Sequence, residues 1–338
     1  MRILIAGLGA IGQRHARNLR TLRGDGVELL AYRQRRLKQV ITESLSSDAS
    51  RDVEEELGVT TFDDLDAALA ARPDAVFICT PSSQHVAIAQ RAADAGCHLF
   101  IEKPVSNTLD GVGQLLQSVA DRKLIAVVGC QWRFHPCVIA LHVLLTTRSL
   151  GDVRSAELDY ADYLPDWHPY EDYRTSYAAR AELGGGVVLT QIHDYDLAFW
   201  LFGAPRAVRA AGGHLSDLEV DVEDTVDATL ETMTASVRVR QTFAHGPPRR
   251  TITVRGTAAT ASLDLLAASL VVQPQVAAGR EVADYQRNQM FLSEATHFLD
   301  CIEGNASAVA PLVDGAVVLG VALAVKEAMK SGRTVQLT

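Results

Sequence analysis

The first twelve residues, MRILIAGLGAIG (1–12), place a short apolar run directly before three glycines with the spacing G-x-G-x-x-G. The apolar run predicts a buried strand, and the amphipathic stretch 11–22 predicts a helix. In such a strand–turn–helix, Gly7 permits the tight turn, Gly9 lets the backbone approach a pyrophosphate, and Gly12 allows close helix packing. The positive end of the helix then faces the phosphates. We therefore expect a dinucleotide site, rather than a glycine-rich turn without a ligand, with contacts from Gly7, Gly9, Ala10, Ile11 and Gly12.

An alternation of short apolar runs with helical patterns continues to about residue 129, which is typical of a doubly wound parallel sheet. Beyond it the pattern changes to helices mixed with a series of strands between 208 and 265. We predict an α/β protein with an N-terminal Rossmann domain (1–129) and a C-terminal α+β domain (130–338) with a large, open, mostly antiparallel sheet. The strands predicted for the first domain are 3–6, 27–32, 75–79, 98–101 and 125–128.

Composition excludes several classes of protein. The chain has 338 residues, which suits about two domains of roughly 150 residues each. Its net charge of -9 gives no general attraction to nucleic acids or to anionic lipids. No apolar run approaches the roughly 18 residues that cross a bilayer, and the first one is too short for a signal peptide, so we expect a cytoplasmic protein. The five cysteines are widely spaced without the pattern of a zinc site, and we expect no metal.

The choice of cofactor depends on residues about 20 positions past the glycines, where a site for NAD usually has an Asp or Glu that binds the ribose 2′-hydroxyl. Residues 31–36 read AYRQRR, with no carboxylate and three arginines. Arg33 and Arg35 suit the extra 2′-phosphate of NADP, because guanidinium groups bind phosphate through two hydrogen bonds. The alternative is a solvated surface run of charge. We expect NADP or NAD as the cofactor, and the arginines favour NADP.

Two further motifs follow predicted strands of the first domain, CTPSSQH (79–85) and EKP (102–104). Both lie at the carboxyl ends of strands, where open α/β sheets bind ligands. A lysine beside a bound cofactor can donate a hydrogen bond to the substrate oxygen and stabilise its alkoxide character, so Lys103 is a catalytic candidate. A surface lysine paired with its neighbour is the alternative. The cofactor contacts predicted here are Thr80, Pro81, His85, Glu102 and Lys103.

The second domain carries a third group of motifs: RFHP (133–136), GGG (184–186), HDYD (193–196) and PLVDG (311–315). Together with the motifs of the first domain, they make nearly the whole chain similar to the glucose-fructose oxidoreductase / inositol dehydrogenase (Gfo/Idh/MocA) family. The resemblance implies an NAD(P)-dependent oxidoreductase in which Lys103 contacts both the nicotinamide side and the reacting hydroxyl. It also implies a cofactor contact from Arg133, and homodimers or homotetramers built through the open sheet.

The helix predicted after the triple glycine carries His193 on one face with Thr190, Asp194 and Leu197. An unperturbed histidine pKa of about 6.5 suits His193 to accept the proton of a substrate hydroxyl, or to return it in a reduction. A satisfied structural histidine is the alternative interpretation.

The chain departs from the family pattern just before this histidine. Many family members have an aspartate three or four positions earlier, where this chain has Leu189 and Thr190. Two replacements are open: Asp194 or Asp196 orients His193, or Thr190 and Gln191 bind substrate hydroxyls.

Aromatic residues concentrate in YADYLPDWHPYEDYR (160–174), although they make up only 6% of the chain. Aromatic faces pack against the C–H surfaces of sugars, and charged groups bond hydroxyls or a phosphate. Cover of a sheet face or of an oligomer interface is an equally good interpretation. The segment also resembles, more weakly, family members that act on nucleotide-linked sugars. The predicted substrate contacts are Tyr163, Trp167, His168 and Arg174, together with Lys103, Thr190, Gln191 and His193.

Three classes of function fit these motifs. The leading one is hydride transfer between a nicotinamide and the hydroxyl or keto carbon of a sugar, cyclitol or nucleotide-sugar. The second is an NAD-dependent glycosidase that oxidises its sugar transiently. The third is a cofactor-binding regulator without turnover, which the missing aspartate favours and the presence of Lys103 and His193 opposes.

Overall fold

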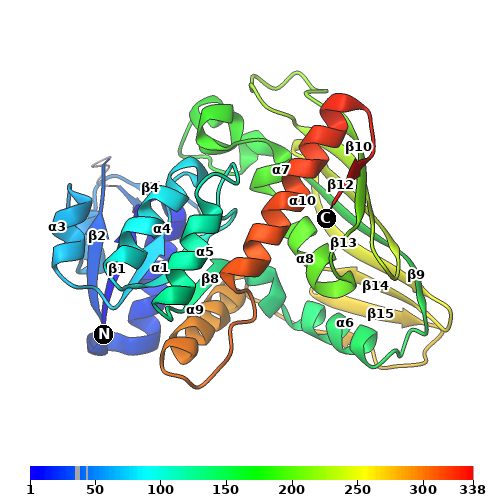
Figure 1. Cartoon of the computed structure of the whole chain (residues 1–338), viewed down its shortest axis with the longest axis horizontal. Coiled ribbons are helices and arrows are strands. Elements are labelled where there is room, and N and C mark those ends of the chain that lie inside the picture. Colours follow the sequence, from blue (N-terminus) through cyan, green and yellow to red (C-terminus); the bar gives the residue numbers. More distant parts are fainter. Residues whose placement is uncertain (35–38, 43–44, 338) are drawn as a thin grey trace. The chain divides into compact units, whose positions relative to one another are not determined.

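The computed structural model describes residues 1–34, 39–42 and 45–337, and the chain separates into two compact units (Figure 1). The first unit contains Met1–Gly129, His168–Asp172 and Phe291–Ala316. The second contains Cys130–Trp167, Tyr173–Met290 and the residues from Val317 onward. Among the described residues, no helix combines the length and the apolar character that a membrane span requires.

The first unit is built on a six-stranded sheet whose described neighbours all run parallel. Its order, β5-β2-β1-β6-β7-β8, reverses between β1 and β6, as in a Rossmann fold. The central strands are continuous runs of buried apolar residues, because helices cover such sheets on both faces. The predicted parallel sheet is confirmed, with one short extra strand, β5. The strands are β1 (Arg2–Ala6), β2 (Glu28–Tyr32), β5 (Thr60–Phe62), β6 (Ala75–Ile78), β7 (His98–Glu102) and β8 (Ala126–Gly129).

Helices connect these strands along the chain. Between β2 and β5 lie a two-stranded ribbon, β3 (Val40–Ile41) with β4 (Ser47–Asp48), and the short helix α2 (Val53–Leu57). Asp52 begins α2 by accepting a hydrogen bond from the Glu54 N–H at 2.9 Å. The other helices are α1 (Ala10–Arg23), α3 (Leu65–Ala70), α4 (His85–Asp94) and α5 (Val112–Asp121).

A late part of the chain completes the core of the first unit. Phe77 and Phe100 stack with their ring centroids 4.5 Å apart, and Phe298 lies edge-on to both at 5.4 and 5.6 Å. Phe298 belongs to α9 (Asn288–Ile302), most of which groups with the first unit. The prediction had assigned all of 130–338 to the second domain, and the apolar face of α9 is the reason that 291–316 packs with the first.

The second unit is built on a nine-stranded sheet with the order β16-β15-β14-β13-β9-β12-β11-β10-β17. Only the β9–β12 pair is parallel among the described neighbours. The predicted large, mostly antiparallel sheet is therefore confirmed. The strands are β9 (Val153–Tyr163), β10 (Ala207–Gly213), β11 (Thr225–Glu231), β12 (Ser236–Thr242), β13 (Ala244–Gly256), β14 (Thr260–Asp264), β15 (Ser269–Gln273), β16 (Arg280–Glu281) and β17 (Val335–Gln336).

The two faces of this sheet differ in chemistry. Burial alternates along β11 and β12, so one face is apolar and the other is polar. On the polar face, Arg240 reaches Glu157 at 2.7 Å and Asp159 at 2.8 Å across neighbouring strands. Helices α7 and α8 pack on the central strands, and α6 packs beside β14 and β15. The helices of the second unit are α6 (Pro136–Thr146), α7 (Val187–Thr190), α8 (His193–Phe202) and most of α10 (Leu312–Ser331).

Candidate functional site

The glycine turn after β1 has the shape that a pyrophosphate needs. Gly7 has a φ of +100°, and a Cβ there would lie 2.8 Å from the Cys79 carbonyl oxygen. A Cβ at Gly12 would lie 2.0 Å from the Gly7 carbonyl oxygen, so close helix packing requires glycine at this position. At Gly9, by contrast, a Cβ would meet nothing within 4 Å among the described residues. Ala10 and Ile11 form the first turn of α1, whose N-terminus no described side chain caps. The turn therefore fits a dinucleotide above Gly9.

At the end of β2, the structure describes one of the two arginines of the predicted phosphate clamp, Arg33. The Arg33 side chain is only 4% exposed, and its NH1 donates to Glu54 Oε1 at 2.7 Å. Arg35 lies outside the described residues. Residues 31–36 contain no carboxylate, but Glu54 of α2 pairs with Arg33.

Buried His85 joins the loops that follow β6 and β7. Its Nδ1 lies 2.8 Å from the Pro104 carbonyl oxygen and its Nε2 lies 2.8 Å from the Thr80 carbonyl oxygen. Burial lowers the pKa of His85, although these two backbone contacts oppose the shift. Thr80 Oγ1 is buried without a partner among the described residues, and Pro81 directly precedes the short helix η2 (Ser82–Gln84). His85 therefore holds the loops at Thr80 and Pro104 together. The Thr80 hydroxyl is left to bind a ligand.

Glu102 supports the backbone of the candidate lysine. Its Oε1 lies 2.7 Å from His15 Nε2, and its Oε2 accepts from the Lys103 N–H at 3.2 Å. Burial by itself would raise the pKa of Glu102, but the hydrogen bond and charge of His15 and the charge of Lys103 hold it below its ordinary value. Glu102 is thus a carboxylate at neutral pH. His15 was missed by the sequence analysis; its position three residues after Gly12, on the same helix face, was the available signal.

His193 begins α8 in the second unit and is 5% exposed. Its Nε2 lies 3.4 Å from Gln131 Nε2, so Gln131 is a neighbour that the sequence analysis missed. Thr190 is fully buried, and its hydroxyl donates to the Gly186 carbonyl oxygen at 2.7 Å. Thr190 therefore already has a partner within its own helix.

A buried arginine organises the polar groups around Gln191. The Arg250 NH2 donates to Gln191 Oε1, and its guanidinium carbon lies 5.0 Å from the Trp132 ring centroid and 4.5 Å from that of Tyr160. Gln241 Nε2 donates to the Gln191 carbonyl oxygen at 2.6 Å. The chain thus brings residues 50 and 59 positions away onto Gln191, which no local pattern had indicated.

The two aspartates near His193 each pair with other groups. Asp194 accepts from Gln241 Nε2 at 2.7 Å and lies 3.4 Å from Arg250 NH1. Burial raises the pKa of Asp194 even though Arg250 and Gln241 oppose the shift. Asp196 pairs with Arg133 at 2.6 Å, with both side chains buried.

Arg133, a predicted cofactor contact, is fully buried and pairs with Asp196 of α8. Its side chain has 0% exposed surface, its Nε and NH2 both donate to Asp196, and its guanidinium lies 5.7 Å from the Trp200 ring centroid. Arg133 thus holds α8 against the turn that follows residue 130, and a cofactor contact from it stays a prediction.

Two glycines of the triple-glycine motif are required by packing. Gly186 has a φ of +99°, and a Cβ there would lie 2.2 Å from Glu223 Oε1. Glu223 in turn accepts from the Val188 N–H at 3.3 Å and from Lys326 Nζ at 2.9 Å. A Cβ at Gly185 would lie 2.6 Å from two backbone carbonyl oxygens. These contacts set the start of α7, which leads directly to His193.

The aromatic segment 160–174 is divided between the units. Tyr163 is 37% exposed at the end of β9, and Trp167 packs edge-on against Phe243 with centroids 5.8 Å apart. His168, which groups with the first unit, pairs with Glu171 at 2.9 Å. Substrate contacts from this segment stay a prediction.

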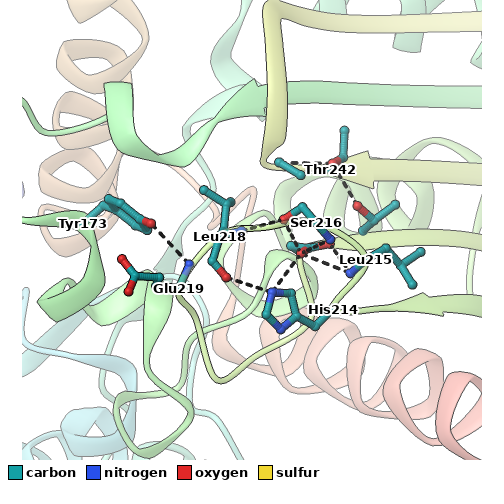
Figure 2. A network of polar contacts seen from close by, with 10 residues as sticks. Tyr173, His214, Leu215, Ser216, Leu218, Glu219 and Thr242 are labelled. Atoms are coloured by element: carbon teal, nitrogen blue, oxygen red, sulfur yellow. Dashed lines mark hydrogen bonds and ion pairs between the residues drawn. The ribbon is translucent and has the colours of Figure 1, made fainter.

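The C-terminal end of the segment is tied to a neighbouring loop, as Figure 2 shows for Tyr173 and Glu219. The Tyr173 hydroxyl accepts from the Glu219 N–H at 3.2 Å, and Arg174 pairs with Glu219 at 3.0 Å. Fully buried Asp224 holds the same loop by accepting from the N–H groups of Leu215 and Ser216. Arg174 is therefore engaged by a carboxylate in this structure.

Comparison with known proteins agrees with this geometry. Residues 1–130 match the model of the oxidoreductase family with an NAD-binding Rossmann fold, and residues 138–262 match the GFO/IDH/MocA C-terminal domain. The chain is 32% identical to an inositol 2-dehydrogenase of Rhizobium meliloti over 53% of its length and about half (51%) of that protein's length. It is 27% identical to a UDP-N-acetylglucosamine 3-dehydrogenase of Acidithiobacillus ferrooxidans over 98% of both chains.

Solved structures show the same fold. The Acidithiobacillus ferrooxidans enzyme superimposes with a TM-score of 0.76 at 25% identity over 98% of each chain. A levoglucosan dehydrogenase in complex with NADH superimposes with a TM-score of 0.84 at 19% identity, covering 100% of this chain and 99% of the other. The chain therefore belongs to the Gfo/Idh/MocA family of oxidoreductases, whose N-terminal half is an NAD-binding Rossmann fold.

Proposed function

We propose that the chain is an NAD-dependent dehydrogenase or ketoreductase that acts on a hydroxyl or keto carbon of a sugar, cyclitol or nucleotide-linked sugar. The observation that carries this proposal is the first unit itself. It combines a glycine turn that is open above Gly9 with an E-K-P loop that His15, Glu102 and His85 hold in place. The named activities of inositol, levoglucosan and UDP-N-acetylglucosamine dehydrogenases support the class of substrate.

In the proposed mechanism, bound NAD supplies the hydride acceptor and Lys103 supplies a hydrogen bond to the substrate oxygen. That bond stabilises alkoxide character as the C–H bond is broken. The Glu102 carboxylate accepts a hydrogen bond from the Lys103 N–H and so fixes the backbone of the lysine. The roles of Thr80, Pro81 and the glycine turn are to hold the cofactor.

His193 is the proposed proton carrier of the second unit. Its imidazole accepts the hydroxyl proton in oxidation and returns it in reduction. Gln131 at 3.4 Å is placed to orient the ring, a task that the missing family aspartate leaves open. Gln191 presents a carboxamide that Arg250 fixes, which suits it to a neighbouring substrate hydroxyl.

The test is a fluorescence titration of the purified protein with NADH, followed by an absorbance screen for NADH formation with free sugars, inositols and UDP- or GDP-linked sugars. Saturable NADH binding and turnover on one of these classes are expected. Release of a sugar leaving group without net NADH formation would assign the protein to the NAD-dependent glycosidases instead. Binding without any turnover would identify a regulator, and absence of NADH binding would overturn the proposal.

We also propose that the chain forms homodimers or homotetramers through the polar face of the nine-stranded sheet. Cross-strand ion pairs such as Arg240–Asp159 give that face a fixed charge pattern for a second copy. Light scattering at micromolar concentration is expected to give a multiple of the 36.5 kDa chain mass. A particle of the chain mass would contradict this assembly.

A further inference from the structure

A carboxylate from a different segment reaches the end of β2. Glu54 lies in α2, 21 residues after Arg33, and its Oε1 accepts from Arg33 NH1 at 2.7 Å. Asp52, which caps α2, fixes the Glu54 backbone, and the Arg33 N–H donates to the Phe62 carbonyl oxygen at 3.0 Å. The Glu54 side chain keeps 36% of its surface exposed, whereas that of Arg33 keeps 4%. At the end of β2, the carboxylate of Glu54 is therefore more exposed to solvent than the guanidinium of Arg33.

The end of β2 is where a Rossmann fold distinguishes NAD from NADP. A carboxylate there accepts a hydrogen bond from the ribose 2′-hydroxyl of NAD, while an available arginine binds the 2′-phosphate of NADP. A carboxylate at this place also repels the 2′-phosphate, so it weakens the binding of NADP as well as favouring that of NAD.

We propose that Glu54 sets the preference of this chain for NAD over NADP. It does so by two effects of one carboxylate: it occupies the guanidinium of Arg33, and it places negative charge where a 2′-phosphate would bind. The inference rests on the proposed nicotinamide-dependent function. It reverses the preference for NADP that the arginines of 31–36 had suggested. That stretch contains Arg33 but not Glu54, the carboxylate that pairs with it.

The experiment compares the dissociation constants of NADH and NADPH, measured by fluorescence titration, and needs no substrate. The wild-type chain is expected to bind NADH at least about tenfold more tightly than NADPH. Glu54→Gln keeps the shape of the side chain and suits a helix, and it is expected to shift the ratio toward NADPH by about tenfold or more. Most of the shift is expected as tighter NADPH binding, since the charge of Glu54 then no longer repels the 2′-phosphate.

Two further variants isolate the cause. Glu55→Gln removes the same charge from the exposed neighbouring position of α2 and is expected to leave the ratio unchanged. Arg33→Met combined with Glu54→Gln is expected to lose most of the gain in NADPH affinity, because the Arg33 guanidinium can then no longer bind the phosphate.

The outcomes separate the two proposals. A wild-type chain that binds neither cofactor overturns the proposed function. A wild-type chain that prefers NADPH overturns the role of Glu54 whatever the variants do. Equal ratios in wild type and Glu54→Gln, or equal shifts in Glu54→Gln and Glu55→Gln, overturn it as well.

Discussion

At the scale of single residues, the E-K-P loop shows how a reactive side chain is prepared by groups that lie behind it. His15 is fully buried and packs against the rings of both Phe77 and Phe100, with centroids 5.2 and 4.9 Å away. It bonds Glu102, which bonds the backbone of Lys103. The lysine is therefore placed by a chain of contacts that begins in the core of the unit.

The proposed role of Lys103 predicts a specific kinetic change. Lys103→Ala is expected to lower turnover by about 100-fold or more, the usual cost of removing a hydrogen-bond donor to a developing oxyanion. NADH affinity is expected to remain nearly unchanged, because the glycine turn supplies most of the cofactor contacts. Turnover and NADH titration on the same preparation check both parts, and near-normal turnover would remove Lys103 from the mechanism.

The lowered pKa of Glu102 predicts a pH dependence of stability. A carboxylate whose pKa is lower in the folded than in the unfolded chain stabilises the fold above the unfolded value, and this contribution is lost as the pH falls through the folded value. The loss therefore begins near the ordinary pKa of 4.5 and continues below it.

Urea unfolding at a series of pH values checks this linkage. The wild-type free energy of unfolding is expected to fall more steeply below about pH 4.5 than that of Glu102→Gln, which has no carboxyl proton to bind. Parallel pH profiles for the two proteins would show that Glu102 is not the group responsible.

At the scale of elements, the start of α7 depends on a glycine for two reasons. Gly186 has φ +99° and ψ 150°, a region that is essentially restricted to glycine. Its missing Cβ also leaves room for Glu223, which Lys326 of α10 holds. A second glycine, Gly203 at the end of α8, has a similar conformation, with φ +85° and ψ 176°, but no described atom within 4 Å of an added Cβ.

This pair separates backbone strain from packing. Gly203→Ala is expected to lower the free energy of unfolding by about 1–3 kcal/mol, the usual cost of such a conformation. Gly186→Ala is expected to cost at least about 1 kcal/mol more, because the new methyl group overlaps the Glu223 carboxylate. Urea unfolding of both variants gives the comparison. Equal losses would mean that Glu223 moves aside freely and does not hold the turn.

At the scale of the whole molecule, each compact unit combines segments that lie far apart in the sequence. Phe298 is 190 or more positions from Phe77 and Phe100, yet it closes the same aromatic cluster. Phe243 is buried in the second unit, where Trp167 packs against it. Each unit thus has its own buried aromatic core.

The two cores predict different effects on unfolding. NADH at about 100 times its dissociation constant is expected to stabilise the unit that binds it by about 2.7 kcal/mol. Phe298→Ala is expected to cost about 3–5 kcal/mol and to lower the thermal transition that NADH raises. Phe243→Ala serves as the matched control for the second unit. If Phe298→Ala leaves the NADH-dependent transition in place, α9 does not belong to the core of the first unit.

Local patterns in the amino-acid sequence were sufficient for the parallel sheet, the glycine turn and the second, antiparallel sheet. Apolar runs, helical periodicity and glycine spacing act over a few residues, so they can be interpreted without a partner. The short strand β5 was missed because three residues, Thr60–Phe62, carry too little periodicity. The same local view proposed Lys103, Glu102 and His193 as site residues but missed their neighbours His15 and Gln131.

Contacts between distant segments could be found only in the folded chain. The local sequence showed neither that α2 brings Glu54 to Arg33 nor that α8 brings Asp196 to Arg133. His15 with Glu102, and Arg250 with Gln191, are joined across 87 and 59 positions. A buried charged or polar side chain needs an oppositely charged or hydrogen-bonding partner, and that partner decides what the side chain can still bind. Because folding brings the partner from a distant segment, the local sequence does not reveal it.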